Sequence, residues 1–311
     1  MKLFEIRMMM VVAIVGLSIL SGGTQIECSA KVNDSMIVTT DWLAKHLNDD
    51  GLVLLQVGDK KEYDAVHIPG AQYIQTSDIS TPRGQGLILE LPPVDQLKAT
   101  FEKFGVTDKS RIIIYFGKDQ VTPTSRVYFT LDYLGLGDRT SMLDGGLPAW
   151  VAEKRAVTAA VVAPKTGSFT PHPNAKLVVD AAWVSGNINK PGVAILDARD
   201  AKFYTGESAG SMPRAGHIPS AKSIPFSTLV EDSNKFKNPE ALRALFSTAG
   251  VKPKDSVATY CHIGQQASLL YFVARYLGYD AHLYDGSFQD WSNRSELPVE
   301  KSEGNQTAKP N

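Results

Sequence analysis

The 311-residue sequence contains only two cysteines, Cys28 and Cys261, and almost no net charge. Two thiols are too few for a disulfide-based scaffold or a four-thiolate zinc site, although they could form one disulfide, or one could be reactive. The 32 Lys and Arg residues against 33 Asp and Glu give a net charge of −1. This balance argues against nucleic-acid binding, which needs a basic face. Long apolar runs are also lacking beyond residue 30, so we expect no stable membrane insertion there.

The one long apolar run, from Met8 to Leu20, follows a short basic start and precedes small polar residues that end in Ala30. This order is typical of a secretory signal peptide, and the run is short for a membrane span. We therefore expect residues 1–30 to be a signal peptide and the protein to be exported, with the periplasm as the preferred location. Retention of this segment as an anchor is the alternative. Cleavage after Ala30 would remove Cys28 and leave a single thiol in an oxidising compartment.

Four short sequence features occur twice in the chain, in the same order and at similar spacings. This pattern predicts two copies of one domain, with an insertion in the second copy around residues 206–214. Residues 31–151 and 177–301 are the expected domains, 152–176 the linker and 302–311 a disordered tail. The repeated features are Trp42 and Trp183, His67–Ala71 and His217–Ala221, Tyr133–Gly135 and Tyr276–Gly278, and Leu143–Trp150 and Tyr284–Trp291.

Each copy alternates short apolar runs with segments of helical periodicity. In the second copy, residues 193–196, 256–260 and 281–284 are typical of buried parallel strands. Residues 239–246 and 266–277 have apolar residues at helical spacing between them. The strand–helix–strand order predicts an α/β fold in which a mainly parallel sheet is flanked by helices in each half.

The residue with the clearest chemical potential is Cys261, which follows the strand at residues 256–260 and opens a short loop before the next helix. Ligands bind at this edge of open α/β sheets. Gly264 allows the loop to bring its backbone N–H groups together, and the helix dipole adds positive potential. Both effects predict a lowered thiol pKa and a reactive cysteine. A buried inert cysteine and a disulfide with Cys28 are the alternatives.

The residues around this loop resemble the rhodanese family. The resemblance extends over nearly all of the mature chain and implies a tandem-domain sulfurtransferase of the thiosulfate or 3-mercaptopyruvate type. Its fold would be two rhodanese-like domains, each a mainly parallel sheet flanked by helices. The second half carries it through Leu196–Arg199, Phe203-Tyr204, Arg214–Ala221, the loop opened by Cys261, and Asp285-Gly286 through Trp291; the first half through Tyr63, the His67 motif, Leu143–Gly146 and Trp150.

The first half departs from the family pattern at the position of the nucleophile. Aligning the strands places Phe116 opposite Cys261, with Gln56 opposite Asp197 and Gly58 opposite Arg199. A domain without a nucleophile cannot form a persulfide. We expect the first half to form one wall of a cleft between the domains.

The resemblance implies a two-step mechanism through a persulfide on Cys261. The thiolate takes the outer sulfur of thiosulfate or 3-mercaptopyruvate, and the persulfide passes it to cyanide or a thiol. The amides of residues 263–268 would hold the outer sulfur. No metal and no cofactor are required. The partners are therefore a small-molecule sulfur donor and a thiophilic acceptor.

Further site residues follow from the resemblance and from charge. Arg214, in the insertion, and Lys202 are candidates for binding the anionic donor, with exposed loop residues as the alternative. His262 is a further substrate-binding candidate that could support the thiolate or touch the donor, with a solvent-facing loop histidine as the alternative. Asp197 and Arg199 are expected to form a structural pair near the site, and His217 a structural contact, because its motif also occurs in the inactive half. Gly264, Gln265 and Gln266 complete the predicted substrate-binding loop.

The predicted function is thiosulfate sulfurtransferase, or rhodanese. A 3-mercaptopyruvate sulfurtransferase and a non-catalytic persulfide carrier or binding module are the alternatives. A phosphatase of related fold is excluded, because the sixth residue after Cys261 is Ala267 and not the arginine that clamps phosphate.

Overall fold

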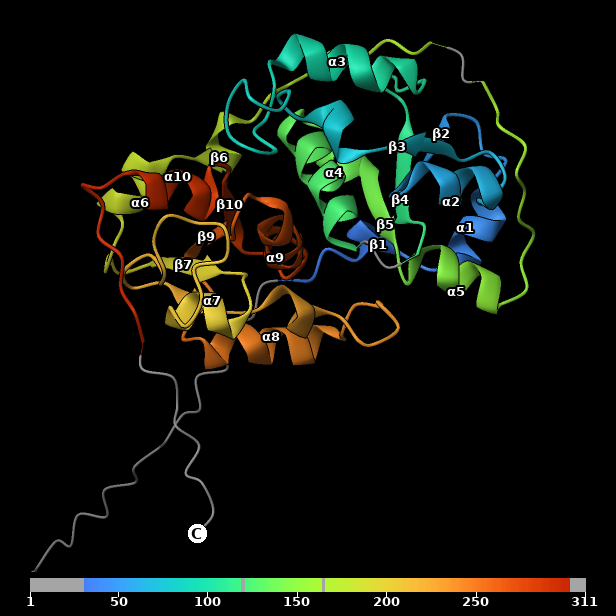
Figure 1. Cartoon of the computed structure of the whole chain (residues 1–311). Helices are drawn as coiled ribbons and strands as arrows, with labels where there is room; N and C mark the ends of the chain where they lie inside the picture. The colour runs from blue at the N-terminus through green and yellow to red at the C-terminus, as the bar shows by residue number, and fades with distance from the viewer. Residues whose placement is uncertain (1–30, 119–120, 164–165, 303–311) are drawn as a thin grey trace, which may run out of the picture.

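A computed structural model describes residues 31–118, 121–163 and 166–302. The predicted signal peptide, with Cys28, and all but the first residue of the predicted tail lie outside these described residues. Figure 1 shows the two halves of the chain as two lobes that meet along helices α4 and α9. The sequence-based prediction of two domains of one α/β fold is confirmed by two five-stranded sheets with the same strand order.

The first sheet has the order β1-β5-β4-β2-β3, and all its strand pairs are parallel. Its helices lie on both faces, as expected for strand–helix–strand units. The elements are β1 Ile37–Val38, α1 Thr40–His46, β2 Leu52–Val57, α2 Lys60–Ala65, β3 Gln72–Ile74, α3 Val94–Lys103, β4 Arg111–Phe116, α4 Val121–Tyr133, β5 Thr140–Leu143 and α5 Gly146–Ala152.

The second sheet repeats this order as β6-β10-β9-β7-β8, again with parallel pairs throughout. Strand β9 has the bounds predicted from the sequence, and helix α9 begins one residue earlier than predicted. The elements are β6 Val178–Val179, α6 Ala181–Gly186, β7 Val193–Asp197, α7 Ala201–Thr205, β8 Lys222–Ser223, α8 Pro239–Thr248, β9 Ser256–Tyr260, α9 Gln265–Tyr276, β10 Asp280–Tyr284 and α10 Ser287–Asn293.

The central strands are apolar on both faces because helices cover both sides of each sheet. In β4, Ile112 and Ile114 belong to the core beneath α3 and α4, whereas Ile113 and Tyr115 belong to the core beneath α1, α2 and α5. The same division recurs in the second half, where α8 and α9 cover one face. A run of consecutive apolar residues therefore forms a strand that is buried on both sides.

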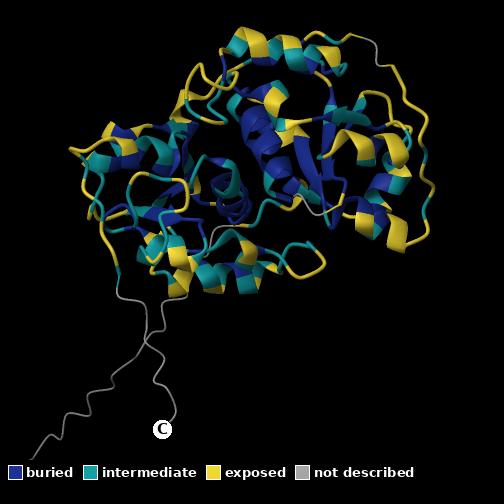
Figure 2. Cartoon of the chain, in the orientation of Figure 1, coloured by how far each residue is buried: buried dark blue, intermediate teal, exposed yellow. Residues whose placement is uncertain are grey.

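Helices α4 and α9 join the two domains. Their aromatic rings meet edge to face, with centroids 4.7 Å apart for Tyr128 and Phe272 and 5.0 Å apart for Phe129 and Tyr271. Both helices are buried along most of their length (Figure 2), and one continuous core includes residues of both domains. Because each helix presents apolar residues to its own sheet and to the other helix, the two domains share this interface.

The segment predicted as a linker follows the surface of the first domain (Figure 1). The backbones of Thr158 and His67 exchange hydrogen bonds of 2.8 and 2.9 Å. Farther along, Phe169 is buried, and the amide of Gly167 donates to the carbonyl of Glu102 at 2.7 Å. The described part of residues 152–176 is therefore held along its length by the domain it leaves.

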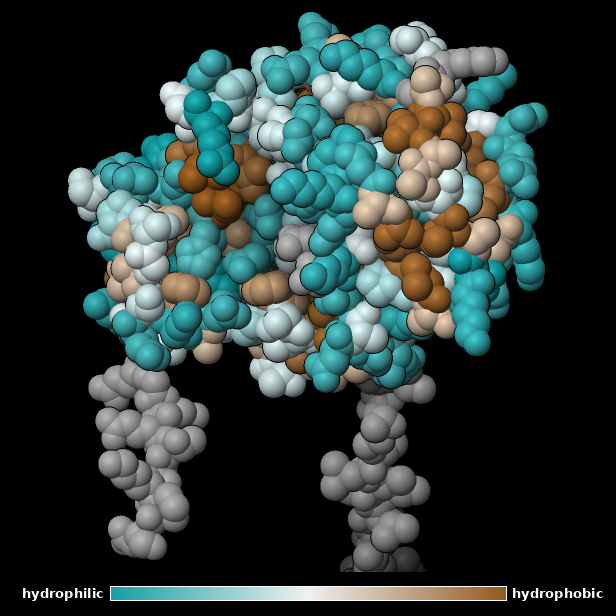
Figure 3. Space-filling model, turned by 45° about the vertical axis from the view of Figure 1, so that its right-hand side comes forward, coloured by the Kyte–Doolittle hydropathy of each residue, from teal (hydrophilic) through white to brown (hydrophobic). Residues whose placement is uncertain are grey.

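The outer surface is predominantly hydrophilic on the face that Figure 3 shows, where hydrophobic residues form separate patches. Within the described ranges, the exposed large apolar side chains outside the site are Val151, Val157, Val161 and Val162, in α5 and the segment that follows it. Among the described residues, no helix has both the length and the apolar character needed to span a bilayer.

Candidate active site

Cys261 follows β9 directly and lies beneath the start of α9. Its side chain is 1% exposed, and it is the one free cysteine within the described residues. Gly264 at the end of the loop has a φ of +88°, a conformation that favours glycine. The backbone therefore turns sharply between the strand and the helix, and the loop closes around the sulfur.

Two opposing effects act on the thiol. Burial raises the pKa of Cys261 above its ordinary value, while the backbone amides of Ala267, Ile263, Gly264 and Gln266 favour the thiolate and oppose that rise. The predicted cradle of amides is present, but the prediction of a lowered thiol pKa is wrong for the resting protein. The physical reason is the nearly complete burial of the sulfur, which the sequence did not reveal.

Ser287 contacts the cysteine backbone and was not among the predicted site residues. Its Oγ accepts a hydrogen bond from the amide of Cys261 at 3.3 Å and donates one to the carbonyl of Tyr284 at 2.9 Å. Its φ is +51°, which is uncommon for a residue with a side chain. This strained residue touches the backbone of Cys261, as is frequent at functional sites.

The first domain shows why only one half carries this serine. Gly146 occupies the corresponding position with a φ of +56°, and a Cβ there would lie 2.7 Å from the ring of Phe116. The bulky phenylalanine requires glycine, whereas the small thiol of Cys261 leaves room for Ser287. The change from Asp-Gly-Gly to Asp-Gly-Ser between the repeats was the sequence signal for this pair.

Asp197 and Arg199 form a buried ion pair at the end of β7. The Arg199 Nη2 donates to Asp197 Oδ2 at 2.6 Å and to the carbonyl of Gly216 at 2.7 Å. The Nε lies 3.0 and 3.1 Å from the two carboxylate oxygens, and the guanidinium lies 4.1 Å from the ring centroid of Phe288. Both side chains are almost inaccessible, at 0% and 1% exposure, so each depends on the other for compensation of its charge.

The first domain lacks this pair at the same place in its sheet. The sheet register places Gln56 beside Tyr115 and Asp197 beside Tyr260, and the residues that follow these tyrosines are Phe116 and Cys261. Gln56 is fully buried, and among the described residues neither atom of its amide group has a hydrogen-bond partner. The predicted correspondence between the two halves agrees with the register.

Arg214 and His217 bind the backbone. The guanidinium of Arg214 donates to the carbonyls of Ser292, Leu297, Trp291 and Arg294 at 2.6–3.0 Å. These contacts hold the segment that follows α10. They also mean that the positive charge of Arg214 is directed at backbone carbonyl oxygens.

The two histidine motifs make the same contact in each half. His217 Nδ1 lies 2.7 Å from the carbonyl of Tyr204 and stacks on its ring, as His67 does with Tyr63. Because this contact is repeated in the domain that has no cysteine in its loop, it serves the fold.

Lys202 and His262 both lie next to Phe203. The Lys202 Nζ lies 5.0 Å from the centroid of the Phe203 ring, which in turn meets the His262 ring edge to face at 4.5 Å. Burial, followed by the charge of Arg199, lowers the pKa of His262. His262 is therefore neutral at neutral pH, with the side chain of Gln266 as a hydrogen-bond partner.

A pocket of about 400 Å³ opens beside the cysteine loop. His262 and Ile263 of the loop form one side, the inserted residues 211–213 another, and Ile88 of the first domain a third. The residues that line it include no lysine or arginine. Within the part of the chain that the structure describes, no group of three or more His, Cys, Asp or Glu side chains is placed to hold a metal ion.

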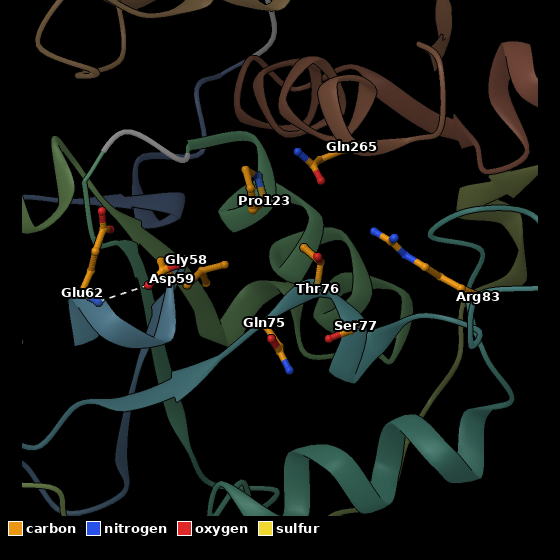
Figure 4. A pocket seen from close by; sticks show the side chains of 10 residues that line it. Gly58, Asp59, Glu62, Gln75, Thr76, Ser77, Arg83, Pro123 and Gln265 are labelled. Atoms are coloured by element: carbon orange, nitrogen blue, oxygen red, sulfur yellow. Dashed lines mark hydrogen bonds between the residues drawn. The ribbon is translucent and has the colours of Figure 1, made fainter. Parts of the chain in front are cut away.

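A second pocket, of about 470 Å³, lies at the corresponding edge of the first sheet and is bounded by both domains (Figure 4). Gln265 reaches into it from α9, and its Nε2 donates to Thr122 Oγ1 at 3.3 Å. Gly58, Thr76 and Arg83 line it from the first domain. The structure thus brings His262, Gly264 and Gln266 together around Cys261, while Gln265 faces the other domain.

The described residues thus form two copies of one parallel α/β fold, and only the second copy has a cysteine loop lined by amides. This arrangement defines a tandem-domain protein with a thiol site in its second domain. The rhodanese-like domain family matches residues 39–153 and again 180–294, and the chain belongs to this family. Homologues in this family are named sulfurtransferases, and its activity class is therefore sulfur transfer.

Three relatives illustrate the range of activities that are named for similar proteins. The chain is 31% identical over 284 residues to the sulfur carrier protein TtuD of Thermus thermophilus, covering 86% of this chain and 97% of that protein. It is 30% identical to a probable 3-mercaptopyruvate sulfurtransferase of Pseudomonas aeruginosa, with 86% and 99% covered. It is 27% identical to a thiosulfate sulfurtransferase of Azotobacter vinelandii, with 83% and 94% covered.

Solved structures share the fold. Wild-type EanB superposes with a TM-score of 0.78 at 20% identity, covering 87% of this chain and 70% of that chain. The structure of YnjE superposes with a TM-score of 0.74 at 21% identity, covering 86% and 69%.

Proposed function

We propose that this protein is a thiosulfate sulfurtransferase that carries sulfane sulfur on Cys261 and delivers it to cyanide or a thiol. The observation that supports it most is the single buried thiol enclosed by the amides of its own loop. Such donors stabilise the negative charge of a persulfide, as they do an oxyanion. The small donor and the thiophilic acceptor are its two partners.

The reaction needs only the thiolate, the donor and the acceptor. The Cys261 thiolate attacks the outer sulfur of thiosulfate, a new S–S bond forms, and the old S–S bond breaks as sulfite leaves with the electron pair. Cyanide then attacks the terminal sulfur of the persulfide. Thiocyanate departs, and the thiolate is restored.

The surroundings of the loop favour a small donor without a carboxylate. A carboxylate is bound best by a free arginine fork, but the fork of Arg214 is engaged with four carbonyls. The residues that line the pocket include no lysine or arginine. The backbone amides of the loop are therefore the groups that would stabilise the negative charge of the donor. Relatives from Azotobacter and Mycobacterium that are named thiosulfate sulfurtransferases agree with this choice.

Turnover with the two donors tests the proposal. We expect kcat/KM for thiosulfate with cyanide to exceed kcat/KM for 3-mercaptopyruvate with a thiol by at least about tenfold, a difference of roughly 1.4 kcal/mol. The measurement is initial rates of thiocyanate and pyruvate formation by one protein preparation. A higher value for 3-mercaptopyruvate would assign the function of the Pseudomonas relative instead. A persulfide without turnover would assign the role of a sulfur carrier, as the name of TtuD indicates.

The rate of donor attack should depend on the protonation of Cys261. Because burial raises the pKa of this thiol, the thiolate is a minor species at neutral pH. We expect kcat/KM for thiosulfate to rise continuously from about pH 6 toward pH 10, without a plateau near neutrality. Because burial lowers the pKa of His262, this side chain does not titrate above neutral pH, so His262→Gln should give a profile of the same shape there. A profile that is flat above pH 7 would contradict the inferred state of the thiol.

A further inference from the structure

Arg126 of the first domain lies directly behind the cysteine loop of the second. It is in the middle of α4, and its side chain is 0% exposed. Its Nη1 lies 3.2 Å from the place where a Cβ of Gly264 would be. Among the described residues, neither Nη1 nor Nε has a hydrogen-bond partner. Two unpaired donors on a fully buried guanidinium cost free energy, and their place beside the cysteine loop suggests that this site is the reason they are retained.

The remaining nitrogen of Arg126 connects both sides of the cleft. Its Nη2 forms an ion pair with Asp285 Oδ1 at 2.6 Å and donates to the carbonyl of Leu89. Leu89 has a φ of +62°, so its backbone is held in a conformation that it does not favour. The next residue toward the N-terminus, Ile88, lines the pocket at the cysteine loop. One guanidinium therefore lies beside the loop, pairs with Asp285 and binds the backbone of the cleft wall.

Comparing the two domains shows which of these contacts simply hold the domains together. In each half, the aspartate of the repeated Asp-Gly sequence accepts a 2.9 Å hydrogen bond from a backbone amide of the other half. Asp285 accepts from Leu91, and Asp144 accepts from Phe236. The two domains are thus held together by two equivalent hydrogen bonds, one from each half.

The arginine, in contrast, occurs on one side only. Counting back from the Tyr-Leu-Gly sequences at the ends of α4 and α9, the position that matches Arg126 is Leu269. The second domain therefore has a buried leucine, Leu269, at the position from which an arginine would face the equivalent loop of the first domain. That loop of the first domain contains Phe116 and no thiol. The charge is present only where there is a nucleophile to support.

We propose that Arg126 is a positioning residue for sulfur transfer, supplied by the domain that lacks a nucleophile. It fixes Gly264, and with it the amides that face the sulfur, and it holds the Leu89 carbonyl that shapes the cleft wall. The proposal rests on the proposed function for its kinetic consequences. Lysine at this position keeps the charge but has no fork, so it cannot pair with Asp285 and also fill the place beside Gly264.

The test compares Arg126→Lys with wild type in steady-state kinetics and in persulfide formation followed by intact mass. A misplaced reacting group costs about 10²-fold in rate. We therefore expect kcat to fall by roughly 10- to 100-fold with a much smaller change in KM and a folded protein by thermal melting. Arg126→Met, which removes the charge as well, should be slower still. Wild-type kcat in a folded Arg126→Lys variant would overturn the proposal.

Arg275→Lys is the matched control. Arg275 Nε pairs with Asp132 Oδ2 at 3.2 Å across the same interface, but at the other end of α9, roughly 15 Å from the loop along the helix. This substitution weakens an ion pair between the domains without touching the cradle, and kcat should stay at the wild-type value. An equal loss in both variants would show that docking alone is responsible and would also overturn the proposal.

Alkylation of Cys261 by iodoacetamide separates this inference from the proposed function. It reports the state of the thiol even in a protein that turns over neither donor. If the amides lose their alignment, the thiolate loses stabilisation, and alkylation near neutral pH should slow in Arg126→Lys but not in Arg275→Lys. An unchanged or faster rate in Arg126→Lys would contradict the positioning role, whatever the outcome of the turnover assays.

Discussion

Replacing Cys261 with serine should abolish sulfur transfer, lowering kcat by at least about 10⁴-fold. The reaction depends on a sulfur nucleophile that can accept and release a second sulfur, and a hydroxyl group forms no persulfide. Serine otherwise fits a site built around a small, buried side chain. The measurements are thiocyanate formation and intact mass after incubation with thiosulfate. Wild type should gain one sulfur and the variant none.

Cys28→Ser is the natural control, since Cys28 is the other cysteine of the sequence. The full chain with this change should retain its kcat and its single added sulfur. Residual turnover in Cys261→Ser that disappears only in the double variant would move the chemistry to Cys28. Full activity in Cys261→Ser would refute the persulfide mechanism.

The largest loss of stability is expected for Asp197→Asn. The change leaves Arg199 charged and buried without its carboxylate, which costs about 3–5 kcal/mol. In the wild type, the Asp197 carboxylate keeps the pKa of Arg199 above its ordinary value although burial opposes the charge. Without that carboxylate the guanidinium still holds its proton, because arginine is in effect always protonated in proteins, so the charge stays buried and unpaired. The free energy of unfolding, measured in urea, should fall by this amount.

Two comparisons sharpen this prediction. Asp64→Asn removes the partner of Lys60 in an exposed ion pair within α2 and should cost less than about 1 kcal/mol. The double variant Asp197→Leu with Arg199→Met removes both buried charges and should be less destabilised than Asp197→Asn. If Asp197→Asn were as stable as Asp64→Asn, the pair would not be the buried unit described above.

The repeated sequences predicted most of the fold. Because a parallel strand between two layers of helices is apolar on both faces, residues 256–260 were recognisable as a strand, and the adjacent Gly264 indicated the turn into α9. The offset between the repeats was sufficient to align Phe116 with Cys261 and Gln56 with Asp197, and the sheet register agrees. These features are local or periodic, and a sequence displays them directly.

The contacts of single side chains could not be predicted in the same way. Arg214 has the side chain of a typical anion-binding residue, yet its partners are backbone carbonyls some 80 positions away along the chain. Ser287 had a signal in the repeat, but its meaning depended on the volume of the residue facing it. Arg126 was not among the predicted site residues, and its position behind Gly264 requires both domains.

The sequence by itself determined the family, the α/β architecture and the duplication, and it singled out the thiol that we propose as the nucleophile. Each of these depends on the order of residues along the chain. Only the tertiary structure decided the state of the thiol and the partners of the arginines. The thiol pKa is set by how completely the fold excludes water from Cys261, and the arginines by which carbonyls and carboxylates the packed domains bring within reach. Burial and distance are properties of packing between segments far apart in sequence, so they appear only when the two domains are assembled.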